Sequence, residues 1–500
     1  MKLLLKILRA SVCMIASCAF FSCATTFPRE NGVRAADGAA LQSSMRATGG
    51  DRAINSEQAS NSMRVVDSAS SQNELQIVGL ANGIPLYIQN NMANRKLALA
   101  VIVQGGTAYL TRETSGLESA LFSMMTYGSQ KYNYDTLQQL AYKMNFAITS
   151  SVSREGAILS MSCIDYYFET VLPIFADAFL HPAFEKEQYD MLMTRYAQDM
   201  QRLQTDSQNM LAYEMTQTVF KNHPYAVSSA VRPYSIENIT IENIMRLHER
   251  DMDARRIMIV AVGNFNAKTL AKKLNKTFGA IDAQSYELHT AVVPPLSISG
   301  APVVITSEAA SGTGYLEKVA SGPSIFDDDM TAAALAATMY SQVLFNIVRE
   351  KYGACYTPSA SITPMRAGMS SVYIFKASDL QNVVTYEREA HDIFTRGFVI
   401  DGKNDDGTYA LSPIADRLEG YKNQYINSFY ASSVTNSSVA SRIAYSLLMF
   451  GEPYAYDKRI ARIADVSAKE VQVAFEKYWA KDSGQWFAVV GPADKENVQF

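Results

Sequence analysis

The chain has 500 residues, of which 48% are hydrophobic and 19% are charged, and its formal net charge is -4. These values are typical of globular proteins, and the length predicts two domains with large cores. The slight negative charge provides no basic field to attract nucleic acid, so we expect no nucleic-acid partner.

The N-terminus has the pattern of a targeting segment. Lys2, Lys6 and Arg9 precede an uncharged, mostly apolar run over residues 10–22. This run is too short to cross a bilayer as a helix of the mature protein. A small residue directly before Cys23 is similar to the processing site of bacterial lipoproteins.

We therefore predict that residues 1–23 are a lipoprotein-type signal peptide and that Cys23 is lipidated. Cys18 is the alternative, because the letters Ile-Ala-Ser before it fit the usual lipobox better, although only eight residues separate it from Arg9. A plain secretory signal with incidental cysteines is a further alternative. All three predict export to the periplasm or cell envelope, and the lipoprotein signals add a membrane anchor.

Residues 24–73 are rich in Ala, Ser, Asn and Gly and poor in large apolar side chains. Such a segment cannot bury enough surface to fold alone, so we predict a flexible tether. Cys163 and Cys355 are the two cysteines that follow it. Two cysteines do not make a disulfide framework.

A first domain is predicted over residues 74–285. Strand-like runs and an Asn82-Gly83 hairpin turn alternate there with segments of helical period. Strands are expected at 75–80, 86–89, 97–103, 147–152, 156–163 and 256–263. Helices are expected at 116–128, 134–143, 166–180 and 185–220, the last with an interruption near Asp206.

A linker over residues 286–302 leads to a second domain over residues 303–500. Both domains end in a similar strand, Ile-Val-Ala-Val-Gly-Asn and Phe-Ala-Val-Val-Gly-Pro, which indicates one duplicated unit. The predicted fold class is α+β, with two duplicated α/β-sandwich domains that each pack helices on a mixed sheet. The second domain is expected to have strands at 303–306, 371–375 and 486–491 and helices at 330–350, 383–398 and onward to Tyr478.

Residues 116–129 read Gly-Leu-Glu-Ser-Ala-Leu-Phe-Ser-Met-Met-Thr-Tyr-Gly-Ser. They resemble the signature helix of the insulinase/pitrilysin (inverzincin) zinc peptidases, Gly-Leu-x-His-x-x-Glu-His-Met-x-x-x-Gly-Thr. Ser119 and Ser123 stand in the two histidine positions, and Phe122 stands in the position of the catalytic glutamate. Zinc needs imidazole, thiolate or carboxylate ligands. The resemblance therefore implies a peptidase fold with no metal and no cofactor on this chain.

The resemblance covers about residues 74 to 500. Its further elements are the first hairpin at Asn82-Gly83, a helix break, a turn after the long helices and the turn that ends the first domain. The last three read His181-Pro182-Ala183-Phe184, His223-Pro224-Tyr225 and Val262-Gly263-Asn264-Phe265. Each is weak alone, but their order and spacing together are specific.

The resemblance also places a third zinc ligand, a glutamate in active members, at Asp199 or Met200. Asp199 is the candidate remnant, and a solvated aspartate on a polar helix face is the alternative. A serine nucleophile at Ser119 or Ser123 would need a His-Asp arrangement that the sequence does not offer. No two of the five histidines stand four apart, so no replacement helical zinc site is predicted at His181, His223, His248, His289 or His391.

Residues 348–356 resemble the family's Arg-Glu-x-x-Gly-x-x-Tyr element. The resemblance implies that Arg349 and Tyr356 hold the substrate backbone and the oxyanion of the tetrahedral intermediate, from the half opposite the zinc. A helix-terminal Arg and a sheet Tyr kept for packing are the alternative.

The family binds peptide as an added strand at a sheet edge near the zinc helix. The matching residues here are Thr149, Ser150, Ser151 and Val152. Active members carry Asn-Ala where Thr149 and Ser150 stand, and a polar strand is also typical of a solvent-facing edge.

The first hypothesis is a catalytically incomplete homologue, the non-zinc subunit of a heterodimeric zinc peptidase that acts on peptides. Its partner would carry the intact zinc motif and the zinc, and this chain would supply Arg349 and Tyr356. The second hypothesis is a peptide-binding or structural lipoprotein with the same fold and no catalysis.

Overall fold

The computed structural model describes residues 75–289 and 292–500. The predicted signal peptide, the lipidation at Cys23 or Cys18 and the tether over residues 24–73 lie outside the described residues. Those three assignments stay predictions.

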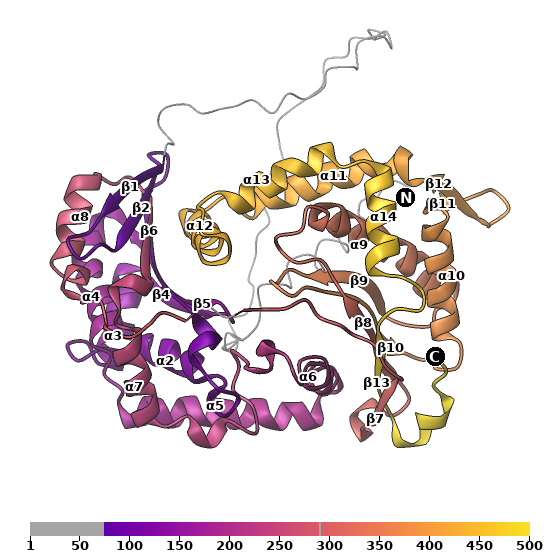
Figure 1. Cartoon of the computed structure of the whole chain (residues 1–500), viewed down its shortest axis with the longest axis horizontal. Helices are drawn as coiled ribbons and strands as arrows, with labels where there is room; N and C mark the ends of the chain where they lie inside the picture. Colours follow the sequence, from indigo (N-terminus) through magenta and orange to yellow (C-terminus); the bar gives the residue numbers. More distant parts are fainter. Residues whose placement is uncertain (1–74, 290–291) are drawn as a thin grey trace, which may run out of the picture. The chain divides into compact units, whose positions relative to one another are not determined.

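The first half is built on a six-stranded mixed sheet in the order β1-β2-β6-β3-β5-β4 (Figure 1). Its strands are β1 (Leu75–Gly79), β2 (Pro85–Asn90), β3 (Lys96–Gln104), β4 (Ala147–Val152), β5 (Gly156–Ile164) and β6 (Ile257–Gly263). Its helices are α2 (Leu117–Met125), α3 (Tyr134–Met144), α4 (Phe168–Leu180), α5 (Lys186–Thr205), α6 (Ser207–Val219), α7 (Ile241–Asp251) and α8 (Ala267–Asn275).

The second half contains a five-stranded sheet in the order β7-β13-β8-β10-β9 and a separate β11-β12 hairpin. Its strands are β7 (Val303–Thr306), β8 (Gly314–Ser321), β9 (Thr357–Thr363), β10 (Met369–Ala377), β11 (Phe398–Lys403), β12 (Tyr409–Pro413) and β13 (Gln485–Val490). Its helices are α9 (Met330–Leu344), continued by the π-helical segment η10 (Phe345–Lys351), α10 (Val383–Thr395), α11 (Ile414–Ala431), α12 (Asn436–Phe450), α13 (Ala455–Ala461) and α14 (Ala468–Tyr478).

The two sheets have the same topology. In the first, β2 pairs in parallel with β6, and β6, β3, β5 and β4 follow in antiparallel register. In the second, β7 pairs in parallel with β13, and β13, β8, β10 and β9 follow in the same way. The predicted fold class is therefore confirmed, and the strand order places α2 and α9 in equivalent positions, because α2 follows β3 and α9 follows the equivalent strand β8.

Several second-half elements were missed or misplaced by the sequence patterns. The strands β8, β9 and the β11-β12 hairpin were not predicted, because β9 carries Pro358 and several Ser residues and β8 lacks a clean alternation. The helix predicted over 383–398 ends at Thr395, because Gly397 adopts a φ of 85° that leaves the helix, and Phe398 already belongs to β11. In the first half, the expected interruption lies at Asp206, whose side chain caps α6.

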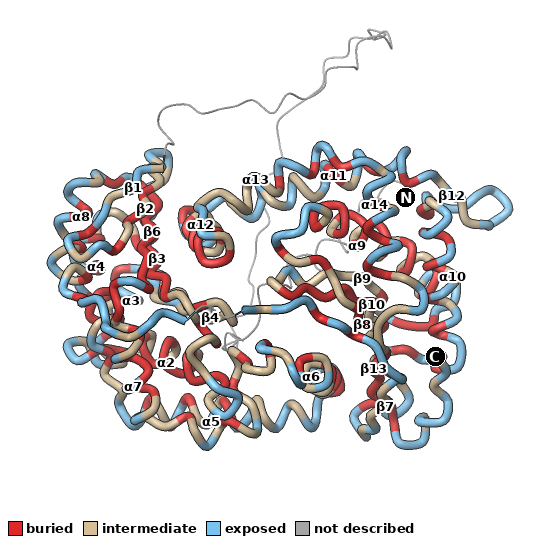
Figure 2. Tube along the Cα trace, viewed as in Figure 1, coloured by how far each residue is buried: buried red, intermediate tan, exposed pale blue. Residues whose placement is uncertain are grey.

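The central strands of each sheet, such as β3, β6 and β13, are buried on both faces, and the second face is covered by a helix from the other half. Leu97, Leu99 and Val101 of β3 belong to the core formed with the first half's own helices. The alternate residues Ala98 and Ala100 pack instead against α12. Figure 2 shows the resulting buried path of β3 and β6.

The arrangement is reciprocal. In β13, Trp486, Ala488 and Val490 face the core of the second half. Phe487 and Val489 pack against α6 of the first half, together with Leu211 and Met215 of that helix. The long apolar runs in the sequence follow from burial on two faces.

Polar contacts also stabilise the interface between the two halves, at its edge. Glu155, in the β4-β5 turn, forms a 2.7 Å ion pair with Arg366 in the equivalent β9-β10 turn. Tyr225 donates a 3.0 Å hydrogen bond to the same carboxylate. Asn436 at the start of α12 hydrogen bonds with Asn91, next to the end of β2.

The segment Met330–Lys351 is apolar and long enough, by length and composition alone, to cross a bilayer. In the described part of the chain it is 72% buried as α9 and η10. A core helix passes the same test of length and composition.

We predict that Leu447→Ala lowers the free energy of unfolding by about 2–5 kcal/mol, because it leaves a cavity between α12 and the first sheet. Leu447 is fully buried. Val434 precedes α12 and is 73% exposed, so Val434→Ala is the control and should change stability by less than about 0.5 kcal/mol. Chemical denaturation measures both, and equal effects would contradict the packing of α12 on this sheet.

Candidate active site and its degenerate metal position

Helix α2 begins at a backbone position that favours glycine. Gly116 has a φ of 81°, and a Cβ there would lie 2.3 Å from the backbone nitrogen of Val231. The Gly116 N–H donates to the carbonyl of Ser228. The loop over residues 228–231 thus fixes the start of the helix that carries the former zinc motif.

The three motif positions have other partners here. Ser119 donates a short hydrogen bond to the carbonyl oxygen of Ser229. Phe122 is fully buried and contributes to the apolar core. Ser123 accepts a 3.4 Å hydrogen bond from the guanidinium of Arg195 on α5.

Within the described residues, Asp199 forms no hydrogen bond with Ser119 or Ser123. Its carboxylate pairs with Arg202 at 3.2 Å, and its side chain is 44% exposed. The structure therefore places Asp199 on the solvated face of α5.

The donor set does not fit zinc. The motif positions hold two neutral hydroxyls and a phenyl ring, which are poor zinc ligands. The positively charged Arg195 guanidinium, which hydrogen bonds with Ser123, would repel an incoming metal cation. Among residues 75–289 and 292–500, no group of three or more His, Cys, Asp or Glu side chains could hold a metal ion.

The serines also lack a base. The buried His248 contacts the carbonyl of Phe179, and His391 contacts that of Trp479. Within the described residues, no histidine hydrogen bonds with Ser119 or Ser123, whose partners are the Ser229 carbonyl and Arg195.

Arg195 joins α5 to α2 through hydroxyl groups. Its second guanidinium nitrogen donates to the Tyr127 hydroxyl at 3.3 Å. The guanidinium also lies 5.6 Å from the ring centre of Tyr196. Burial raises the pKa of the Tyr196 phenol to about 12, and the nearby Arg195 and Ser123 oppose that shift.

A buried charge cluster supports α2 from behind, and sequence reasoning missed it. Glu118 and Asp251 are buried, and Arg256 forms a 2.8 Å ion pair with Asp251 at 2% side-chain exposure. Burial and the neighbouring Asp251 raise the pKa of Glu118 well above its ordinary value, against the pull of Arg256 and Arg250. On an amphipathic helix such as α7, a charged residue gives no sequence signal of burial.

Arg349 and Tyr356 are close together. Arg349 lies in η10 and donates a 2.8 Å hydrogen bond to the backbone carbonyl of Tyr356. Its guanidinium lies 5.0 Å from the ring centre of Phe345 and 4.9 Å from that of Tyr356. The Tyr356 side chain is 65% exposed, so its phenol is accessible. π-helical turns of this kind are frequent at functional sites.

The two equivalent edge strands differ. In β4, the predicted peptide-binding residues Thr149, Ser150, Ser151 and Val152 alternate between exposed and half-buried, and β4 ends the first sheet in the described chain. In β9, Ser341 of α9 accepts a 2.9 Å hydrogen bond from the Ala360 N–H and lies 2.9 Å from its carbonyl oxygen. The Ser341 side chain thus hydrogen bonds with backbone groups of β9, whereas in the described residues no side chain hydrogen bonds with the backbone of the edge strand β4.

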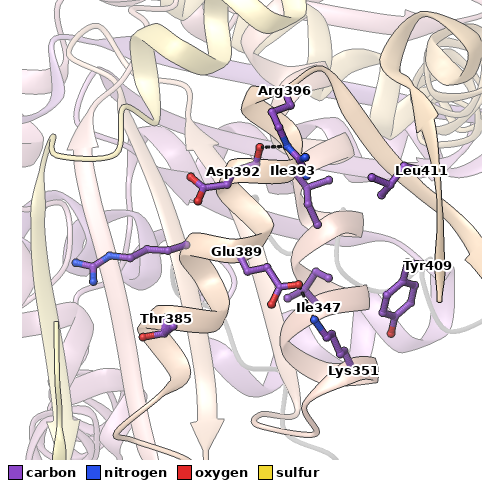
Figure 3. A pocket seen from close by; sticks show the side chains of 10 residues that line it. Ile347, Lys351, Thr385, Glu389, Asp392, Ile393, Arg396, Tyr409 and Leu411 are labelled. Carbon is purple, nitrogen blue, oxygen red and sulfur yellow. Dashed lines mark hydrogen bonds and ion pairs between the residues drawn. The ribbon is translucent and has the colours of Figure 1, made fainter. Parts of the chain in front are cut away.

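A cavity of about 500 Å³ lies elsewhere in the second half, between η10, α10 and the β11-β12 hairpin (Figure 3). Lys351 and Glu389 form a 2.7 Å ion pair along its wall. Its lining includes neither Arg349 nor Tyr356. This cavity is separate from the predicted site residues.

Sequence comparisons identify the family. Residues 86–231 match the profile of the insulinase family, peptidase family M16, and residues 238–390 match the M16 inactive domain. The chain belongs to the insulinase/pitrilysin family, as its degenerate motif indicated.

Two relatives span most of the chain. The "Probable mitochondrial-processing peptidase subunit beta" of Arabidopsis thaliana is 20% identical over 422 residues, which cover 83% of this chain and 77% of the relative. The "Uncharacterized zinc protease YmxG" of Bacillus subtilis is 19% identical over 421 residues, which cover 82% and 97% of the two chains.

Solved structures share the fold. The M16 inactive-domain protein of Pseudomonas fluorescens superposes with a TM-score of 0.71 and 16% identity, covering 84% of this chain and 98% of that one. A Helicobacter pylori protease gives 0.71 with 13% identity, covering 83% and 99%. The periplasmic protease PqqL of Escherichia coli gives 0.67 with 15% identity, covering 84% of this chain and 45% of that one.

We predict that the purified protein holds no stoichiometric zinc, because Ser119, Phe122 and Ser123 provide no adequate ligand set. Metal analysis after dialysis tests this prediction. One tightly held zinc ion per chain would contradict it.

We predict that Glu118→Gln reduces the loss of stability that occurs as pH rises above about 4.5. With a raised pKa, Glu118 keeps its proton in the folded state at pH values where the unfolded chain has lost it. Its contribution is therefore full below the ordinary pKa and disappears as pH rises through the raised value. Unfolding measured across pH tests this, and a parallel pH profile in the variant would contradict it.

The contrasting variant is Asp251→Asn. It removes the carboxylate that pairs with the buried Arg256, and breaking a buried pair on one side costs about 3–5 kcal/mol. It should therefore destabilise the protein at neutral pH, where Glu118→Gln should not.

Proposed function

We propose that this chain is a catalytically incomplete insulinase-family protein, the non-zinc subunit of a two-chain zinc peptidase that acts on peptides. The partner would carry the intact His-x-x-Glu-His motif and the zinc. Two observations together carry this proposal. Ser123, in a metal-ligand position of the motif, hydrogen bonds with Arg195, and Arg349 lies next to Tyr356, whose phenol is accessible.

The chemistry of that pair suits a partner's active site. A guanidinium and a phenol donate hydrogen bonds to negative charge that develops on a substrate oxygen. Arg349 is 31% exposed and is held between two rings, so its position is fixed before any substrate arrives. Its bond to the Tyr356 carbonyl also fixes the backbone from which the phenol projects.

The names of relatives support an assembly and an exported location. The Arabidopsis thaliana relative is named as a subunit, and the Escherichia coli structural relative is named as periplasmic. These names and the predicted signal at residues 1–23 support our proposal that the protein is exported to the periplasm or cell envelope and anchored there through lipid on Cys23, with Cys18 as the alternative.

The second candidate is a non-enzymatic peptide-binding or structural lipoprotein. The open β4 edge favours it, since strand addition needs no catalytic group. In addition, one Arg349 nitrogen is already engaged by the chain's own backbone.

We predict that Tyr356→Phe lowers the peptidase activity of the complex with its zinc-bearing partner by roughly 10²–10³-fold, the usual effect of losing one oxyanion donor. Turnover should fall more than substrate affinity, because the phenol acts on transition-state charge. The measurement is peptide cleavage by the complex purified from the native host.

Tyr430→Phe is the matched control, because Tyr430 is 64% exposed in the same half and loses the same hydroxyl. Melting curves and co-purification should be unchanged in both variants. Equal activity of the two variants would reject the catalytic role of Tyr356 and favour the non-enzymatic candidate. Arg349→Ala is less diagnostic, because it also removes the bond to the Tyr356 carbonyl.

A further inference from the structure

We propose that Arg195 turns the former metal position into a binding site for a peptide carboxylate, either a C-terminus or an acidic side chain. The inference rests on the proposed function only in taking a peptide as the ligand. It concerns binding to this chain alone and needs no partner and no zinc.

The Arg195 guanidinium is held by neutral groups. Its two terminal nitrogens contact the hydroxyls of Ser123 and Tyr127 at 3.4 and 3.3 Å. A guanidinium has five N–H donors, so these two long bonds leave donors for a ligand. Hydroxyl acceptors orient the group without neutralising its charge.

The neighbouring acids on α5 are paired with other cations. Asp190 forms a 2.6 Å ion pair with Lys186, and Asp199 forms one with Arg202. In the described ranges, no carboxylate forms an ion pair with Arg195 itself. Among the basic residues of α5, Lys186 and Arg202 form ion pairs, and Arg195 forms none within the described residues.

The surroundings strengthen an ion pair at this point. Arg195 is half-buried and lies near the ring of the buried Tyr196. Coulomb attraction grows as the local dielectric falls, and Arg binds carboxylates through two parallel hydrogen bonds. Contacts with the Ser123 hydroxyl on α2 and the Tyr127 hydroxyl just after its end limit the conformations of the guanidinium before a ligand binds, which reduces the entropic cost of binding.

The helix that contacts Arg195 also packs against the edge strand β4. Helix α2 packs against both α5, which carries Arg195, and β4 (Figure 1). A peptide added to β4 would run past the face of α2 on which an active peptidase places its metal ion. In this chain the Arg195 guanidinium hydrogen bonds with Ser123, one of the two positions where the resemblance implies a metal ligand. It can bind a carboxylate, but it cannot activate water for hydrolysis.

The test is equilibrium binding of labelled, unstructured peptides to the purified protein in the absence of any partner. Three peptides share one sequence: a free C-terminus, an amidated C-terminus, and an amidated form with one internal Glu. We expect at least one carboxylate peptide to bind roughly tenfold or more tightly than the amidated peptide, as for a charge-assisted hydrogen-bonded pair. The peptide that binds tightly shows whether the site recognises a C-terminal carboxylate or the side chain of an acidic residue.

Arg195→Gln should remove this preference and leave the affinity for the amidated peptide unchanged, which also shows that the variant is folded. Arg195→Lys should retain part of the preference, because lysine keeps the positive charge but cannot form the two parallel hydrogen bonds of a guanidinium with a carboxylate. Lys186→Gln is the control on the same helix and should bind like the native protein, because Lys186 pairs with Asp190, which does not stand one turn from Arg195. Equal affinity for all three peptides, or a preference that survives Arg195→Gln, would overturn the proposal.

This outcome is independent of the test at Tyr356. A carboxylate preference that depends on Arg195 can hold even if Tyr356→Phe leaves the complex fully active. Conversely, loss of activity in Tyr356→Phe supports the catalytic proposal whatever peptide end the chain prefers.

Discussion

The structure depends on an exchange of helices between two copies of one unit. Each sheet has two apolar faces, and each unit covers only one of them with its own helices. Helix α12 of the second unit covers the remaining face of the first sheet, and α6 of the first unit covers that of the second. Neither sheet could stay out of water on both faces without the other unit, so the described body is expected to fold as one cooperative whole.

The duplication also explains where the functional elements lie. The degenerate zinc helix α2 follows β3, and α9 with its π-helical continuation follows β8, the equivalent strand. The former metal positions and the Arg349/Tyr356 pair thus derive from corresponding segments of the two units. The two copies differ at their edge strands. Ser341 of α9 hydrogen bonds with the backbone of β9, and no side chain in the described residues does so with β4.

Loss of the zinc ligands did not leave α2 without support. Ser119 and Ser123 found new hydrogen-bond partners, and Phe122 joined the core. Behind the helix, the buried Glu118 lies close to the Asp251–Arg256 pair, and burying charged groups is energetically costly. Such a cluster can hold α2 in one position, and we regard that as its structural role.

The family and the fold could be predicted from the amino-acid sequence, because an ordered set of short motifs and the apolar runs of buried strands are present even though Ser119, Phe122 and Ser123 stand in the positions of the zinc motif. The sequence also located most first-half elements, where strands such as β3 are apolar throughout. It could not find β8, β9 or the β11-β12 hairpin, whose short, Ser-rich or irregular patterns gain stability only from neighbouring strands. The hydrogen-bond partners of Ser119 and Ser123 could be identified only from the tertiary structure. Arg195 stands 72 positions from Ser123 in the chain, and nothing local in either segment specifies that contact.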